Sequence, residues 1–249
     1  VDLSKVKGSG ESGRILKKDL EKAGKTPELV PQQKIKVQRK YDMYGYVERI
    51  PLKGIRKTIA DNMIKSLSET AQVTSMDDID ISKLWRIRNR EKKVLEKQGV
   101  KLTFLPFIIK AVIAAIKEHP IINSSIEGDE IIIKKYYNIG IAVETDLGLV
   151  VPVVKIADSK NMLQIAKEVK GLAEKAKNRT IDLMDLQGSS FTITNYGSIG
   201  GTYGTPIINP GEAAILGLGR IFDRVVSVNG KLKNIKVLPV SLTFDHKIL

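Results

Sequence analysis

The chain has 249 residues, of which 42% are hydrophobic and 28% are charged, and its formal net charge at pH 7 is +13. That length accommodates one large domain, alone or with a small satellite domain. Because the chain has no cysteine and only two histidines, His119 and His246, we expect no disulfide bond, no thiolate nucleophile and no metal site.

The apolar and basic patterns bear on location and partners. No run of about 18 apolar residues indicates a membrane-spanning helix, and residues 1–5 contain no apolar core of a signal peptide. We therefore expect a protein of the cytoplasm, or of the mitochondrial matrix in a eukaryote, with no membrane partner. Basic side chains are densest in the first 50 residues, but few are interleaved with aromatic ones. This pattern favours acidic protein partners or a phosphate-bearing cofactor over nucleic acid.

The first 49 residues contain two stretches of different character. Gly8, Gly10 and Gly13 predict a tight loop, and the apolar spacing that follows predicts a short helix over residues 13–23. Residues 25–49 are polar, contain two prolines and show no sustained period. We interpret residues 25–49 as a flexible linker.

From residue 50 onward the hydrophobic pattern predicts a globular domain of helices and strands. Apolar residues at helical spacing predict helices over 54–70, 82–97, 103–118 and 161–178. Short apolar or alternating runs predict strands over 73–81, 131–133, 138–143, 149–154, 191–194, 213–218, 224–228 and 237–244. The dipeptide Asn229-Gly230 predicts a hairpin turn between the last two strands. We therefore expect the α/β (α+β) class, with a mixed, largely antiparallel sheet and helices.

Four segments resemble a known family. The chain ends in Asp245-His246-Lys247-Ile248-Leu249, which resembles the start of an Asp-His-[Arg/Lys]-x-x-Asp-Gly active-site motif. Residues 50–63, 138–153 and 188–217 resemble, in order and spacing, further parts of the catalytic domain of the 2-oxo acid dehydrogenase acyltransferases. Residues 1–24 are similar to the second half of the peripheral subunit-binding domain of the same proteins.

The resemblance implies a domain organisation. It implies a chloramphenicol-acetyltransferase-like catalytic domain over residues 50–249 and half of a small helical subunit-binding domain over residues 1–24, in a sequence truncated at both ends. Because the closing Asp and Gly of the motif would follow Leu249, we expect the chain as it stands to be inactive or badly impaired. One departure is visible, since family members often have Pro-His before the first strand and this chain has Ala71-Gln72.

The family's reaction assigns roles to two residues. It moves an acyl group from a dihydrolipoyl thioester to the thiol of coenzyme A. A thiol with a pKa of about 8.5 is mostly protonated at neutral pH, so the attack needs a general base such as a neutral imidazole. His246 matches that base. Negative charge then develops on the thioester oxygen, and Thr194 matches the family's hydroxyl donor for that oxygen.

The resemblance also implies how coenzyme A is held. It places Leu216 and Gly217 on the strand that lines the channel for the pantetheine arm, and it adds Asn195 beside them. Arg56 and Lys160 are our candidates for the adenosine 3′-phosphate, which needs basic groups. The Asp-Lys-Ala attachment turn of a lipoyl domain does not occur in the sequence, so the lipoyl group is expected on a domain outside this chain.

The implied partners are protein subunits. The resemblance implies homotrimers in which the histidine and the hydroxyl of one active site come from neighbouring subunits, and trimers that build a large hollow core. Arg14 and Lys17 match basic residues that grip the 2-oxo acid decarboxylase or dihydrolipoamide dehydrogenase. The run Gly-Ser-Ile-Gly-Gly-Thr-Tyr over residues 197–203 favours a branched-chain or pyruvate substrate type.

Three alternatives remain open. A non-catalytic scaffold paralogue would bind the same partners without transferring acyl groups, although such a protein has no need for both His246 and Thr194. An acyltransferase outside the complexes would share the fold, although residues 1–24 argue against it. A basic nucleic-acid-binding protein would show a salt-dependent shift with random DNA.

Overall fold

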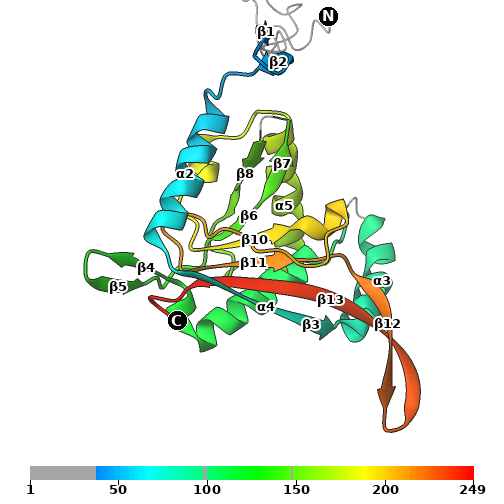
Figure 1. The fold of residues 1–249 in the computed structure, drawn as a ribbon. Helices are drawn as coiled ribbons and strands as arrows, with labels where there is room; N and C mark the ends of the chain where they lie inside the picture. Colours follow the sequence, from blue (N-terminus) through cyan, green and yellow to red (C-terminus); the bar gives the residue numbers. More distant parts are fainter. Residues whose placement is uncertain (1–37, 98–99, 147) are drawn as a thin grey trace, which may run out of the picture. The chain divides into compact units, whose positions relative to one another are not determined.

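The computed structural model describes residues 38–249 apart from 98–99 and 147 (Figure 1). The chain divides into two compact units, Val1–Leu52 and Lys53–Leu249. The expectations for residues 1–24, including Arg14 and Lys17, lie outside the described residues.

The described part of the first unit is a small hairpin. Strand β1 (Gln38–Tyr41) pairs antiparallel with β2 (Tyr46–Arg49). The Oδ1 atom of Asp42 accepts hydrogen bonds from the backbone of Tyr44 and Gly45, which closes the turn. The sequence indicated no regular structure here, because a four-residue strand is too short to show a period. The role of residues 25–49 as a linker stays a prediction.

The second unit contains a seven-stranded mixed sheet. Its strand order is β12-β13-β11-β10-β6-β9, and β3 lies along the second half of β13. The pairs β6–β10 and β10–β11 are parallel and the other four are antiparallel, which confirms the predicted fold class. The strands are β3 (Gln72–Asp80), β6 (Ile139–Ile141), β9 (Val153–Val154), β10 (Phe191–Asn195), β11 (Ala214–Leu218), β12 (Phe222–Val228) and β13 (Lys231–Asp245).

Strand β13 organises the end of the sheet on which His246 lies. Its first half pairs with β12, and its second half is flanked by β3 on one edge and β11 on the other. Asn229 and Gly230 have φ values of 53° and 77°, so the predicted two-residue hairpin turn is confirmed. The strand starts at Lys231, earlier than the predicted residue 237, because its first half is an exposed ribbon whose lysines obscure the strand pattern (Figure 1).

Two further hairpins lie outside the main sheet. Strand β4 (Ser124–Glu127), which was not predicted, pairs with β5 (Glu130–Ile133). Strand β7 (Val143–Thr145) pairs with β8 (Gly148–Val150). The predictions of single strands over 138–143 and 149–154 were therefore wrong. Pro152 has no N–H for a ladder, and it separates β8 of the outer hairpin from β9 of the main sheet.

The four predicted helices of this unit are confirmed. They are α2 (Ile55–Glu69), α3 (Ser82–Glu96), α4 (Leu105–Glu118) and α5 (Met162–Lys177). Buried Ile109 and Ile113 of α4 share one apolar core with Ile165 of α5 and with Ile139 and Ile193 of the sheet. This core fixes the strands that carry the candidate site. In the described part of the chain, no helix combines the length and the apolar character needed to cross a bilayer.

Candidate active site

His246 follows the last residue of β13 and is exposed. Its backbone N–H donates to the Ala71 carbonyl at 2.8 Å. Its ring Nδ1 lies 2.6 Å from the backbone oxygen of Leu249. A backbone oxygen can only accept, so this contact favours the tautomer that carries a proton on Nδ1, and in a neutral ring that tautomer leaves the Nε2 lone pair available. That tautomer suits a general base whose Nε2 faces a substrate.

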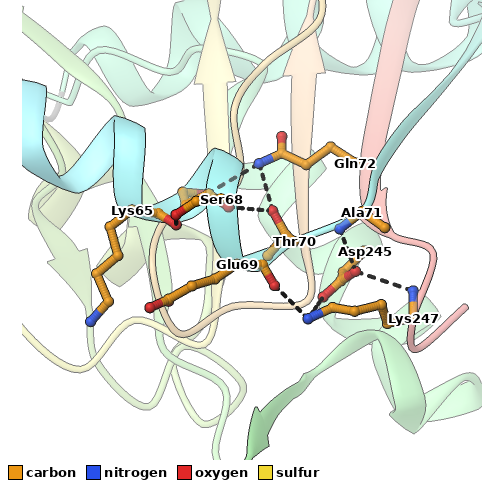
Figure 2. Close-up of polar contacts among 9 residues, drawn as sticks. Lys65, Ser68, Glu69, Thr70, Ala71, Gln72, Asp245 and Lys247 are labelled. Carbon is orange, nitrogen blue, oxygen red and sulfur yellow. Dashed lines mark hydrogen bonds and ion pairs between the residues drawn. The ribbon is translucent and has the colours of Figure 1, made fainter.

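Asp245 is the last residue of β13 and directly precedes His246, and Figure 2 shows its carboxylate between Ala71 and Lys247. Its side chain is 3% exposed, and its Oδ1 accepts from the backbone N–H of Ala71 at 2.9 Å and of Lys247 at 3.1 Å. Its main-chain oxygen accepts from Ile248 and Leu249 at 2.9 and 3.1 Å. Sequence reasoning gave this residue no role. An acidic residue that ends an apolar strand was the available signal.

Thr194 lies at the other end of the sheet, near the end of β10. It is half-buried and pairs in parallel with Gly217 of β11. It lines a cavity of about 1240 Å³. Arg56 of α2 and Asn195, two of the predicted coenzyme-binding residues, line the same cavity. The structure thus brings three of the predicted site residues together.

Leu216 and Gly217 are placed differently from these three. Neither is among the residues that line the Thr194 cavity or the smaller cavity beside it. A Cβ atom on Gly217 would lie 2.6 Å from the ring of Tyr196, so that ring covers the glycine. Leu216 packs against the apolar core. Their part in a pantetheine channel stays a prediction.

The smaller cavity has a volume of about 760 Å³ and shares Asn195 and Lys177 with the first. Its basic lining residues are Lys101, Lys170, Lys177 and Arg220. Lys160 lines neither cavity, and its Nζ pairs with the Glu168 carboxylate at 2.6 Å. No cluster of three or more potential metal ligands occurs within the part of the chain that the structure describes.

Glu212 is a buried acid that sequence reasoning missed. Burial raises the pKa of its carboxyl group, although hydrogen bonds from Ser189, Asn209 and Thr192 act in the opposite direction. Thr192 Oγ1 donates at 2.8 Å, two residues before Thr194 on β10. Glu212 therefore supports the strand that carries Thr194. A single acid within the run 211–214, just before a buried strand, was the sequence signal.

The strand registers fix the separation of His246 and Thr194. Thr194 is level with Gly217, and Gly217 is level with Ser241 of β13. His246 follows Ser241 by five residues. The offset is therefore about 17 Å along the strands and about 10 Å across them. One copy of the chain cannot bring both side chains to the same reacting group.

The chain is similar to characterised proteins over its whole length. Residues 44–249 match the family described as 2-oxoacid dehydrogenases acyltransferase (catalytic domain), and residues 1–21 match the e3 binding domain. The dihydrolipoyllysine-residue acetyltransferase component of the pyruvate dehydrogenase complex of Bacillus subtilis (strain 168) is 41% identical over 262 residues. That alignment covers 100% of this chain but 59% of the relative, so the chain spans less than two thirds of the relative's length.

Two solved structures have the same fold. Each has a TM-score of 0.80 and 41% identity, over 83% of this chain and 86% of its own. One is the Azotobacter vinelandii dihydrolipoamide acetyltransferase, from crystallographic and enzymatic work on a serine, a histidine and an asparagine in its catalytic mechanism. The other is the cubic core of the pyruvate dehydrogenase multienzyme complex. These similarities agree with the resemblance found in the sequence.

Proposed function

This chain belongs to the 2-oxoacid dehydrogenase acyltransferase family, and we propose that it transfers an acyl group between a dihydrolipoyl thioester and coenzyme A. The observation that carries this proposal is that the chain provides both an exposed imidazole, whose Nδ1 faces a backbone oxygen, and a hydroxyl that lines a cavity. His246 supplies the imidazole and Thr194 the hydroxyl. The work on a serine and a histidine in the Azotobacter vinelandii relative supports the same pair of roles.

The two side chains account for the steps of the reaction. Nε2 of His246 takes the proton from the coenzyme A thiol, and the thiolate attacks the thioester carbonyl carbon. The oxygen that becomes negative accepts a hydrogen bond from Thr194 Oγ1. The tetrahedral intermediate then expels the dihydrolipoyl thiolate, which takes the proton back from the imidazolium. Acyl-CoA and the free dihydrolipoyl thiol are the products.

The separation of His246 from Thr194 supports an active site shared between two copies of the chain. An offset of about 17 Å along rigid, paired strands keeps one copy's base away from its own hydroxyl, which supports a site completed by a second copy. We propose homotrimers, in which each subunit gives its histidine to one neighbour and its hydroxyl to the other. The similarity to a cubic multienzyme core supports further assembly of such trimers into a hollow shell.

The residues that line the Thr194 cavity are our candidates for holding coenzyme A. Arg56, Asn195 and Lys177 line it, and cations there complement the phosphates of the coenzyme. Lys160, Leu216 and Gly217 are weaker candidates, because none of them lines either cavity. The lipoyl group would arrive on a domain outside this chain.

We also propose an acyl group and a docking site for protein partners. Identity of 41% to an acetyltransferase component of a pyruvate dehydrogenase complex supports the pyruvate type, with acetyl as the acyl group, over the branched-chain type. The match of residues 1–21 to the e3 binding domain supports a docking role for Arg14 and Lys17. A comparison of acetyl-CoA with isobutyryl-CoA as acyl donor tests the substrate.

The test of the function is an acyl-transfer assay with dihydrolipoamide and acetyl-CoA. It is run on the intact, assembled protein and on its His246→Ala and Thr194→Ala variants. Activity that is lost in His246→Ala and reduced about 100-fold in Thr194→Ala is the expected result. An assembled but inactive protein would instead support the non-catalytic scaffold paralogue.

A further inference from the structure

Lys247 reaches from the end of the chain's last strand to the end of helix α2. Its Nζ donates a hydrogen bond to the carbonyl of Glu69, the last residue of α2 (Figure 2). Helix α2 has no basic residue in its own last turn. The carbonyls of a last turn have no partner within the helix, and a cation beside them is favourable. Lys247 supplies that cation from 178 residues away in the sequence.

The same ammonium group faces Asp245. Lys247 Nζ lies 3.6 Å from Asp245 Oδ2, and the Asp245 side chain is 3% exposed. A buried carboxylate is costly unless it is hydrogen-bonded or paired with a cation. Asp245 has both, since Oδ1 takes two backbone N–H groups and Oδ2 faces Lys247. The buried Asp245 carboxylate therefore depends on these two hydrogen bonds and on the nearby Lys247 ammonium.

These contacts surround His246 on both sides. Asp245 precedes it and bonds to Ala71 N, while His246 N itself donates to Ala71 O. Lys247 follows it and bonds to Glu69 O. The α2–β3 junction thus holds the backbone before, at and after the imidazole. We call the side chains of Asp245 and Lys247, with these contacts, the bracket.

We propose that Asp245 and Lys247 are positioning residues that hold His246 at the geometry needed for proton transfer. This inference rests on the proposed acyl transfer. Neither residue touches a substrate in this scheme, and both act through the turn that carries the imidazole. A displacement of about 1 Å in a reacting group can cost about 100-fold in rate, so a bracket of this kind has a measurable effect.

The α2–β3 junction is also held by hydrogen bonds that do not involve Asp245 or Lys247. Gln72 Nε2 donates to Thr70 Oγ1 at 2.8 Å and to Ser66 Oγ at 3.1 Å (Figure 2). Thr70 N donates to the Ser66 carbonyl at 3.1 Å. When the Lys247 ammonium is removed, we therefore expect the end of α2 to stay in place and the His246 turn to move.

Lys247→Met, which keeps the stem and removes the ammonium, is the main test variant. Lys247→Arg, which restores a cation, is the rescue. Lys65→Met is the matched control, because Lys65 is an exposed lysine on the same helix whose side chain points away from the bracket (Figure 2). Asp245→Asn tests the acid, because it keeps an acceptor for the backbone N–H groups and removes the charge facing Lys247.

The first readout is steady-state kinetics. Lys247→Met is expected to lower kcat by about 10- to 100-fold with little change in KM for either thiol substrate. Lys247→Arg recovers most of kcat, and Lys65→Met equals the wild type. A wild-type kcat in both Lys247→Met and Asp245→Asn would overturn the proposal. The proposal would also be overturned if Lys247→Met lost kcat in parallel with a lower unfolding temperature and Lys247→Arg did not restore kcat.

A second readout does not depend on activity. The chain has two histidines, so ethoxycarbonylation of His246 by diethyl pyrocarbonate can be followed by peptide mass spectrometry with His119 as the internal reference. A loosened turn releases Nδ1 from the Leu249 oxygen in addition to the available Nε2, so Lys247→Met should raise the His246 rate several-fold while His119 is unchanged. An unchanged His246 rate would refute the bracket. An inactive wild type whose His246 rate does respond would refute the proposed function and leave the bracket standing.

Discussion

The hydroxyl of Tyr196 lies 2.8 Å from the Oγ of Ser241, two strands away from the end of β10. To reach it, the Tyr196 ring crosses the α-carbon of Gly217. The turn that follows Thr194 is thereby fixed to the centre of the sheet. The absence of a side chain at Gly217 is what allows the contact.

Gly217→Ala is expected to destabilise the protein by about 1–3 kcal/mol, because its methyl group would overlap the Tyr196 ring. Gly171→Ala is the matched control. Gly171 lies within α5, and no atom lies within 4 Å of the place that an added methyl group would take, so alanine there should stabilise by about 0.5–1 kcal/mol. Denaturant unfolding of both variants is the measurement. Equal effects at the two positions would contradict the steric argument.

Thr194→Val should lower kcat by about 100- to 1000-fold, because valine has nearly the shape of threonine and lacks the hydroxyl that we propose stabilises the oxyanion. Thr194→Ser keeps the hydroxyl and should retain most of kcat. Steady-state kinetics in both directions of the reaction is the measurement. A serine variant as impaired as the valine variant would assign Thr194 a packing role instead.

A mixture of two inactive proteins should regain activity if the site is shared between copies. His246→Ala and Thr194→Val subunits, unfolded together and reassembled at equal ratio, should recover about a quarter of the wild-type rate, because random cyclic assembly pairs an intact histidine with an intact threonine at about one interface in four. Each variant reassembled alone is the control. A mixture that stays inactive would place both residues of a site in one copy.

Glu212 should make stability depend on pH. Burial raises the pKa of its carboxyl group, so the folded state binds the proton more tightly than the unfolded state does. The stabilisation is fully present below the unfolded pKa of about 4.3 and is lost as pH rises through the folded pKa. Glu212→Gln mimics the protonated form and should lack this loss. The unfolding free energy of the glutamine variant minus that of the wild type should therefore increase as pH rises from about 5 to 8.

Glu212→Gln and the wild type share every other titrating group, which makes their difference specific to this carboxyl. A difference that stays constant across the pH range would contradict a raised pKa at Glu212. A difference that moves in favour of the wild type as pH rises would contradict its sign.

The helices after residue 53 could be predicted from the sequence, while His246 and Thr194 stay predicted site residues. Apolar spacing defines α5, which buries one face, and it also defines α2, although the apolar Ile55, Ile64 and Leu67 of α2 are exposed. The residues around His246 and Thr194 carry short patterns that are local in the chain. The break between β6 and β7 was not predicted. It depends on where the chain leaves the main sheet, which an unbroken apolar run does not reveal.

The supports of the site could not be predicted, because they join distant parts of the chain. Asp245 and Ala71 are separated by 174 residues, and Glu212 gains its partners only when β10 and β11 align. Leu216 and Gly217 show the same limit. Their strand was identified correctly, but which of its residues line a cavity depends on the Tyr196 ring lying over it.

The two ends of helix α2 lie near the two proposed catalytic residues. Its first turn carries Arg56, which lines the Thr194 cavity, and its last carbonyl receives Lys247 beside His246. A 15-residue helix is about 22 Å long, close to the offset between those two side chains. In a ring of subunits that share their sites, each such rod would link two separate reaction centres. A shift of α2 along its axis at one centre would then be transmitted mechanically to the next.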